Sequence, residues 1–458
     1  MAQHADIELP ASDTRSFGAR AWPLFRNGLL IGAVALIVAL LTAWLTEDFR
    51  RFGFAYVVSF AYVLSLSLGC MALVVLMHLF RAGWGVVIRR PAEIFAANMP
   101  VLAILSAPIL VFVILNNGLL YSWAQPLEGG AAHALGGTMH IVLTDADAAP
   151  APIDVDHAGD DHAGGHELVG LTPEKAHYVQ LKRVWLNIPF FVARWVVYFG
   201  ILSGIGLWYW RQSTLQDTTG DASLTRRMEI FSAPATLLFA FTLTAVAFDL
   251  LMSLDPLWYS TIFGVYYFAG SFMGGLAMLI LVLMGLQRWG HLQSVTAEHF
   301  HDLGKLMFAF VFFWGYIAFS QYMLLWYASL PETAYWFELH GFTTATGKQT
   351  GWSYVGLVLL FGHLLIPFVA LLPRWVKRSR KLLAFWAIWL LVVHWIDLWW
   401  VVMPLYDSTQ ISLGVIEIAV LVGVLAIFLA GGARLAAGTS LVPTKDPRLS
   451  ESLGHVNL

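Results

Sequence analysis

Residues 53–80 read GFAYVVSFAYVLSLSLGCMALVVLMHLF, and this stretch decides the fold class. It contains no Asp, Glu, Lys or Arg, and about 20 apolar residues are enough for an α-helix to cross a bilayer. Similar runs recur along the 458 residues, which are 59% hydrophobic and only 12% charged. Soluble domains are about 25% charged, and a transmembrane β-barrel would show short segments of alternating polarity. The sequence therefore predicts an all-α, polytopic membrane protein.

Ten runs are long and apolar enough to be transmembrane helices. The predicted spans are 27–46, 53–80, 97–120, 184–210, 230–253, 259–286, 305–330, 351–373, 382–404 and 410–433. The predicted organisation is an N-terminal tail (1–26), spans 1–3 (27–120), a long loop (121–182), spans 4–10 (183–433) and a C-terminal tail (434–458).

The distribution of Lys and Arg predicts the orientation. Of the 26 basic residues, 19 fall on the side of both termini, six fall on the opposite side and Arg194 falls within a span. Loops rich in Lys and Arg stay in the cytoplasm, so both termini are expected there. The even number of predicted spans agrees with this orientation.

Two loops on the opposite side have unusual compositions. The loop 121–182 has nine acidic residues and six histidines, which are His133, His140, His157, His162, His166 and His177. This low-complexity composition is more typical of a solvated linker than of a metal or partner site. The segment PETAYWFELHGF (331–342) suggests either an interfacial lid or docking surface, or a loop in the aromatic belt of the membrane.

Several classes of protein are excluded or disfavoured by composition. A single cysteine, Cys70, excludes a disulfide framework, an iron–sulfur cluster held by this chain alone and a covalently attached c-type haem. A net charge of −3 argues against a nucleic-acid partner. The chain has no phosphate-binding loop or dinucleotide fingerprint, which disfavours a nucleotide-driven machine.

Ionisable residues inside the predicted spans are the candidate functional residues, because each costs about 2.5–3.5 kcal/mol at the centre of a membrane helix. They are Arg194, Asp249, His363, His394, Asp397 and Glu417. His394 and Asp397 are three residues apart and therefore share one helix face. The residues suggest either a proton relay or structural ion pairs such as Arg194 with Asp249, and both interpretations remain open.

Two further sites are weighed against simpler explanations. His363 and His394 could ligate a b-type haem, although Asp397 beside His394 fits a polar relay better. Tyr316, Ser320 and Gln321 could line a quinone pocket, although a packed aromatic core is the simpler explanation. Gly200 and Gly204, four residues apart, suit a close helix crossing.

Five segments resemble the ActF-type membrane subunit of bacterial alternative complex III, a quinol:cytochrome c oxidoreductase. They are RVWLNIPFFVARWVVYFGI (183–201), FDLLMSLDPLWYSTIFGVYYFAGSF (248–272), FFWGYIAFSQYMLLWYASLPE (312–332), GHLLIPFVALLPRWVKR (362–378) and HWIDLWWVVMP (394–404). The resemblance covers most of residues 25–430, with the segments in the same order, but neither the histidine-rich loop nor the two tails.

This resemblance implies a fold of the polysulfide-reductase (NrfD/PsrC-like) superfamily, built largely from two four-helix bundles, in the bacterial inner membrane. It implies an ActC-type sibling, periplasmic iron–sulfur and multihaem cytochrome c subunits, and a terminal oxidase as partners. Iron–sulfur clusters and haem c belong to those partners, and menaquinol or ubiquinol is the candidate substrate. It further implies a proton half-channel, with matching polar positions at Asp249, His363, His394 and Asp397.

We therefore expect a cofactor-free membrane subunit that scaffolds a quinol-oxidising complex and offers protonatable groups. Arg194 and Glu417 join the relay because of their predicted membrane burial. Three alternatives are a quinol-binding subunit of the same complex, a stand-alone secondary transporter and a b-haem electron carrier.

Overall fold

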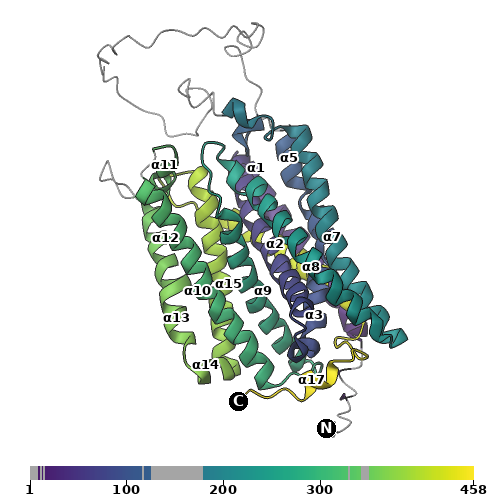
Figure 1. Cartoon of the computed structure of the whole chain (residues 1–458). Helices are drawn as coiled ribbons and strands as arrows, with labels where there is room; N and C mark the ends of the chain where they lie inside the picture. The colour runs from purple at the N-terminus through teal and green to yellow at the C-terminus, as the bar shows by residue number, and fades with distance from the viewer. Residues whose placement is uncertain are drawn as a thin grey trace, which may run out of the picture.

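The computed structural model describes residues 9–10, 13, 16–115, 118–124, 179–328, 331–341 and 350–457. In this part of the chain, ten helical segments are long and apolar enough to cross a membrane, which confirms the predicted class and number of spans. Both ends of the described chain lie at one end of the helix bundle, here called the terminal end, and the opposite end is called the loop end (Figure 1).

Eight of the ten spans form two four-helix bundles that lie side by side (Figure 1). The first contains α2 (Phe49–Leu79), the segmented span α3 (Val86–Ala96), α4 (Met99–Leu105) and α5 (Ala107–Leu115), then α7 (Ile188–Thr219) and α8 (Ala222–Leu250). The second contains α9 (Phe263–Arg288), α10 (Ala297–Ala328), the span α12 (Gly351–Leu359) and α13 (Ile366–Leu371), and α15 (Arg380–Val402). The remaining two spans, α1 (Ala21–Leu45) and α16 (Val415–Ala436), pack on each other, and α16 packs on α2.

The seam between the bundles is the contact of α2 with α9. A Cβ atom on Gly69 would lie 2.0 Å from the carbonyl oxygen of Ser271, and one on Gly275 would lie 2.8 Å from Cα of Gly69. These glycines therefore allow two backbones to touch. The glycines expected at a close crossing, Gly200 and Gly204, would each carry a Cβ with no other atom of the described chain within 4 Å, so that prediction was wrong.

The third span begins earlier than the sequence predicts, at Gly83 instead of residue 97. Arg89, Arg90 and Glu93 lower the hydropathy of its first turns, yet all three are buried in the helix α3. The same span is interrupted before α4 and before α5, each of which has a proline in its first two positions. Proline lacks the amide hydrogen that would continue the preceding helix, which explains the interruptions.

The residues after α16 are not a free tail. Ser440 pairs with Ser16 in an isolated antiparallel bridge, and the short helix α17 (Leu449–Leu453) packs on α3 and on the turn Gly83–Gly85. Leu441 and Val442 are buried. The C-terminal segment therefore closes the terminal end of the first bundle.

Candidate functional site

Arg194 and Asp249 form a saturated ion pair between α7 and α8 in the first bundle. Arg194 donates from Nε and Nη2 to the two carboxylate oxygens at 2.7 and 3.1 Å. Tyr198 and Trp185 donate to the same carboxylate at 2.9 and 3.1 Å. The guanidinium also lies 4.3 Å from the Trp185 ring centroid. Because both charges are paired and hydrogen-bonded, this cluster matches the structural interpretation of these residues.

Glu417 is a helix cap. Its carboxylate accepts from Arg51 Nε at 2.7 Å and from Arg51 Nη2 at 3.0 Å, and it accepts from the backbone amide of Gly414 at 2.7 Å. A carboxylate in the first turn of a helix accepts hydrogen bonds from backbone amides that have no partner within the helix, and its negative charge interacts favourably with the helix dipole. This residue lies at the loop end of α16, and its contacts account for its burial without a relay.

His394 and Asp397 lie in the second bundle, where α15 meets α2, α9 and α10. Asp397 accepts a short hydrogen bond from the Tyr266 hydroxyl and one of 3.2 Å from Trp314 Nε1. His394 Nε2 is 2.8 Å from Ser65 Oγ, and its Nδ1 is 4.0 Å from Asp397 Oδ2. Both side chains are 1% exposed, so the imidazole and the carboxyl are buried close to each other inside the second bundle.

The imidazole of His394 fits against two glycines of α9. A Cβ on Gly270 would lie 2.7 Å from His394 Cε1, and one on Gly274 would lie 3.0 Å from Cδ2. Any side chain at these positions would push the ring away from Ser65. The spacing of four residues places both glycines on one helix face, a signal that was available in the sequence and was missed.

His363 joins the same cluster from a break in the eighth span. Residues Leu360–Leu365 form a π-helical turn between α12 and α13, and π-helical turns are frequent at functional sites. The His363 ring lies 3.8 Å from the Trp314 ring and 6.2 Å from the His394 ring, measured between centroids. Both nitrogens of His363 and Nδ1 of His394 are buried without a hydrogen-bond partner in the described chain.

These contacts separate the six predicted residues into three places. Arg194 with Asp249, Glu417, and the group of His363, His394 and Asp397 belong to different helix pairs. Among these residues, only the last group keeps unused hydrogen-bonding capacity within the described chain, since three imidazole nitrogens are free. We name His363, His394, Asp397, Tyr266 and Trp314 the central cluster. Sequence reasoning missed Tyr266 and Trp314, because an aromatic residue in a span usually signals packing.

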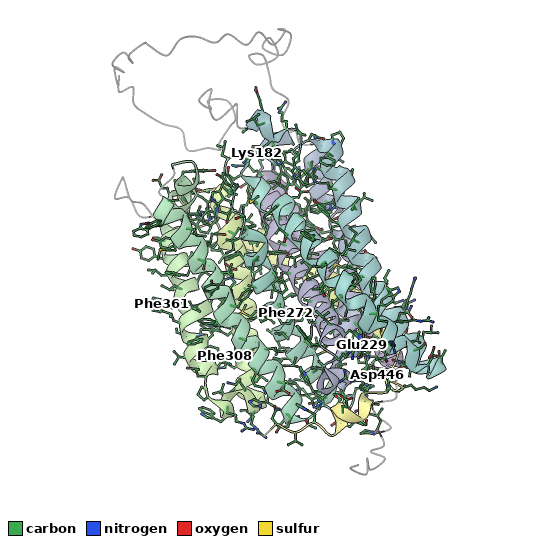
Figure 2. The ribbon with its side chains drawn as sticks, in the orientation of Figure 1. Lys182, Glu229, Phe272, Phe308, Phe361 and Asp446 are labelled. Carbon is green, nitrogen blue, oxygen red and sulfur yellow. The ribbon has the colours of Figure 1, made fainter. Side chains whose placement is uncertain are left out.

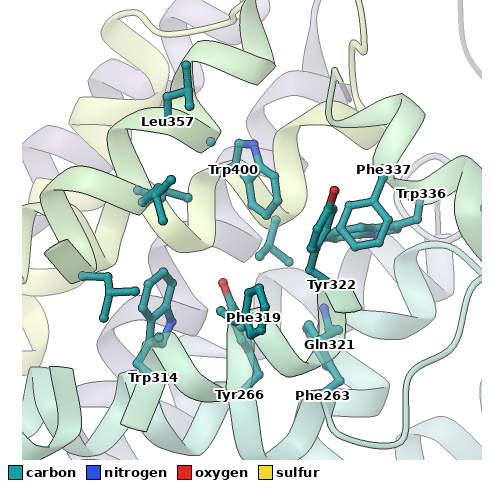
Figure 3. A pocket seen from close by; sticks show the side chains of 17 residues that line it. Phe263, Tyr266, Trp314, Phe319, Gln321, Tyr322, Trp336, Phe337, Leu357 and Trp400 are labelled. Carbon is teal, nitrogen blue, oxygen red and sulfur yellow. The ribbon is translucent and has the colours of Figure 1, made fainter. Parts of the chain in front are cut away.

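A cavity of about 470 Å³ lies beside the central cluster in the loop half of the second bundle (Figure 3). Tyr266 and Trp314 line it, and the same two side chains hold Asp397. The rest of its wall is mainly apolar and comes from α9, α10, α12, α15, the turn Leu360–Leu365 and the helix that follows α10. The cavity therefore approaches the buried carboxyl through one phenol and one indole.

The helix α11 (Pro331–Leu339) covers the loop end of this cavity, as a lid would. Trp336 lines the cavity and stacks on Trp258 with centroids 4.7 Å apart. Tyr335 donates a short hydrogen bond to Asp255, and desolvation raises the pKa of this phenol. His340 follows the helix, is 0% exposed and lies 3.7 Å from the Trp336 ring; burial lowers its pKa to about 4.

The three residues considered for a quinone pocket are placed differently. Gln321 lines the cavity and accepts a hydrogen bond of 3.1 Å from Ser260. Tyr316 is 57% exposed on the outer surface of α10, and Ser320 is half-buried; neither lines the cavity. The helix face that carries Gln321 therefore forms the wall, together with Trp314 and Ala318.

The structure also bears on two rival interpretations. The Trp314 ring packs against the ring of His363, and Ser65 forms a hydrogen bond with Nε2 of His394. These contacts occupy space and a nitrogen that a haem would need, so they favour a polar cluster over a pair of haem ligands. The breaks occur in the second span of the first bundle and the third span of the second bundle. These are not the matching positions that a secondary transporter with two repeats would use.

A charge network at the terminal end was absent from the sequence prediction. Glu93 accepts from Arg89 at 2.8 Å and from Arg90 at 3.0 Å. Arg89 also pairs with Asp446 at 2.7 Å, and Arg90 pairs with Asp217 at 2.8 Å. Figure 2 shows Asp446 at this end of the molecule. The network ties α3 and α7 to the C-terminal segment, so it is structural.

The histidines of the long loop lie outside the described residues. No protein-family model matches this chain, and no curated protein matches its sequence.

Proposed function

We propose that this chain is a multi-pass subunit of a bacterial quinol:cytochrome c oxidoreductase complex of the alternative complex III type, and that its central cluster passes protons. Both termini would be cytoplasmic, as the excess of Lys and Arg predicts, which places the loop end in the periplasm. The redox cofactors would belong to iron–sulfur and cytochrome c partners, beside an ActC-type sibling. This chain would scaffold the complex.

One observation carries the relay proposal: a buried carboxyl and two imidazoles with free nitrogens converge at membrane depth. Four of the five segments that carry the family resemblance supply this cluster. Tyr266 comes from 248–272, Trp314 from 312–332 and His363 from 362–378, while the segment 394–404 supplies His394 and Asp397. The segments that resemble the family thus meet at one place in the fold.

The proposed path runs from the cluster to the loop end. Asp397 exchanges its proton with the Tyr266 hydroxyl, which is its hydrogen-bond partner and faces the cavity under α11. His394 Nδ1, which has no hydrogen-bond partner in the described chain, is 4.0 Å from the same carboxyl and is the next proton acceptor of the proposed path. His363 extends the set of proton acceptors toward the eighth span. Ionisable groups in membrane interiors commonly form such relays.

The test is the ratio of protons released to electrons transferred by the complex in sealed vesicles. We expect Asp397→Asn and Tyr266→Phe to lower this ratio while the complex still assembles. Asp407→Asn is the matched control, because Asp407 is a carboxylate beyond the end of α15 that accepts from the backbone of Thr409 and Gln410. An unchanged ratio in Asp397→Asn, with normal assembly, would overturn the relay.

A second candidate function is quinol binding in the cavity next to Tyr266. The observation that favours it is a mostly apolar space of about 470 Å³ that presents a phenol, an indole and the Gln321 amide (Figure 3). Pockets of about 300–1,000 Å³ with a few convergent polar groups are typical of small-molecule sites. A photoreactive quinone should label α10 in the native chain and lose that labelling in Ala318→Phe. Equal labelling of both would contradict this function.

A further inference from the structure

A second apolar groove, of about 400 Å³, lies in the terminal half of the molecule between α9 and the α1–α16 pair. We name it the terminal groove. One wall consists of Leu281 and Gly285 of α9 and of Trp289, which directly follows this helix. The other wall consists of Leu24 of α1 and Leu429 of α16, and residues of α2 and α3 form the floor. Apart from the Tyr62 hydroxyl and the Trp289 indole, its lining side chains are apolar.

The length of the terminal groove matches one leaflet of a bilayer. From Met278 to Trp289 the chain rises about 16 Å at 1.5 Å per residue. Half of a hydrocarbon core is about 15 Å thick. The groove begins at the terminal end of α9 and therefore runs through the leaflet on that side.

Two arginines lie at the polar rim of this groove. Arg20 donates from Nη1 to the carbonyl oxygen of Trp289 at 2.6 Å, and it lies on the same helix face as Phe17 and Leu24. Arg288 occupies the last turn of α9. Both arginines are exposed, and neither has an ion-pair partner among the described residues.

We propose that the terminal groove binds an anionic phospholipid, with one acyl chain between α9 and α16 and the phosphate between Arg20 and Arg288. Charge complementarity favours this occupant, because two exposed arginines without ion-pair partners in the described chain lie above a groove lined by apolar side chains. The arginines select the charge of the headgroup, and the apolar walls accept the chain.

The bound lipid has a consequence for the central cluster. Tyr62 lines the groove, and its ring lies 5.6 Å from the His394 ring. An acyl chain there closes the terminal side of the cluster to water, so the proposed proton path opens only toward the loop end. This consequence rests on the proposed function, whereas lipid binding does not.

The experiment is native mass spectrometry of the purified chain titrated with dioleoyl phosphatidylglycerol or dioleoyl phosphatidylcholine. We expect the anionic lipid to bind more tightly by roughly 30-fold, since each arginine near an anionic headgroup favours it by roughly fivefold. Arg20→Gln with Arg288→Gln should remove the preference. The control Arg226→Gln with Arg227→Gln, two exposed arginines at the same end on α8, should retain it.

A second variant tests the acyl chain separately. Gly285 lines the groove, and a Cβ placed on it would have no other atom of the described chain within 4 Å, so Gly285→Phe can start a bulky side chain at the groove without a clash at Cβ. This variant should lower the binding affinity for both lipids at least tenfold. The control is Gly200→Phe, at an equally open position on α7. Equal affinity for the two lipids in the native chain, or unchanged binding in Gly285→Phe, would overturn the proposal. This experiment measures no proton transfer, so its outcome does not depend on whether the proposed proton relay is correct.

Discussion

Buried ionisable side chains have two different environments in this protein. Arg194 and Asp249 satisfy each other and are further bonded by aromatic N–H and O–H groups. His363 and His394 instead keep ring nitrogens without partners in the described chain. Burial alone therefore does not identify a functional residue, and unused hydrogen-bonding capacity is the better criterion.

The first residue-scale prediction concerns the ion pair of α7 and α8. Arg194→Met should lower the free energy of unfolding by about 3–5 kcal/mol, because it leaves the Asp249 carboxylate buried and unpaired. The double variant Arg194→Met with Asp249→Leu should recover most of that loss. Equilibrium unfolding in mixed micelles of a mild detergent and SDS measures both. A single variant as stable as the native chain would contradict the structural role.

The second residue-scale prediction concerns the pH dependence of the α11 lid. The folded state holds the pKa of His340 at about 4, compared with 6.5 in an unfolded segment. Above pH 6.5 His340 is neutral in both the folded and the unfolded state, so the free energy of unfolding of α11 does not depend on the His340 proton. As pH falls from 6.5 toward 4, only the unfolded state binds that proton, and the free energy of unfolding of α11 falls by about 1.4 kcal/mol per pH unit.

Hydrogen exchange of the α11 amides at pH 7.5 and pH 5, corrected for intrinsic rates, measures this effect. His340→Phe removes the titrating group and should flatten the dependence while keeping the packing against Trp336. The same pH dependence in this variant and in the native chain would show that another group is responsible.

At the scale of elements, the π-helical turn of the eighth span positions His363. Trp389 of α15 donates to the carbonyl oxygen of Gly362 at 2.7 Å and thereby satisfies a group that the turn leaves unpaired. Trp389→Phe should cost about 1–3 kcal/mol of unfolding free energy. The control is Trp386→Phe, one turn earlier, whose indole has no hydrogen-bond partner in the described chain. Equal losses in the two variants would count against this role.

The sequence predicted most of the elements but not their interruptions. Long apolar runs determine a span, so α2 and α9 agree with prediction within a few residues. The start of the third span was missed because Arg89, Arg90 and Glu93 look like a loop until their partners are known. The π-helical turn is followed by Pro367, whose missing amide hydrogen is a sequence signal for an interruption that was not used, and the indole of Trp389 on another helix bonds to the turn.

The same limit applied to the candidate site. The spacing of His394 and Asp397 predicted a shared face, and the structure brings His363 to them. The pair of Arg194 with Asp249 was one of the two interpretations that the sequence left open, and the structure contains it. The partner of Glu417 was not predicted, because Arg51 lies 366 residues away in the chain. Pairing across such separations is a property of the tertiary fold.

At the scale of the whole molecule, the C-terminal segment completes the first bundle. Asp446→Asn should destabilise the protein by about 2–4 kcal/mol, because Arg89 loses one of its two carboxylate partners in a buried position. The control Asp407→Asn removes a carboxylate charge outside this network and should have little effect. Thermal unfolding in detergent compares the variants. Equal melting temperatures of Asp446→Asn and the native chain would show that the network does not stabilise the fold.

The position of Asp446 near the end of the chain also determines when its contact with Arg89 can form during synthesis. Arg89 emerges from the ribosome 357 residues before this partner, so the nascent third span inserts with incomplete neutralisation of its cations. The final stabilising contact forms only when translation has passed α16. A chain that ends before that point would leave the buried Arg89 guanidinium with Glu93 as its one remaining carboxylate partner among the described residues.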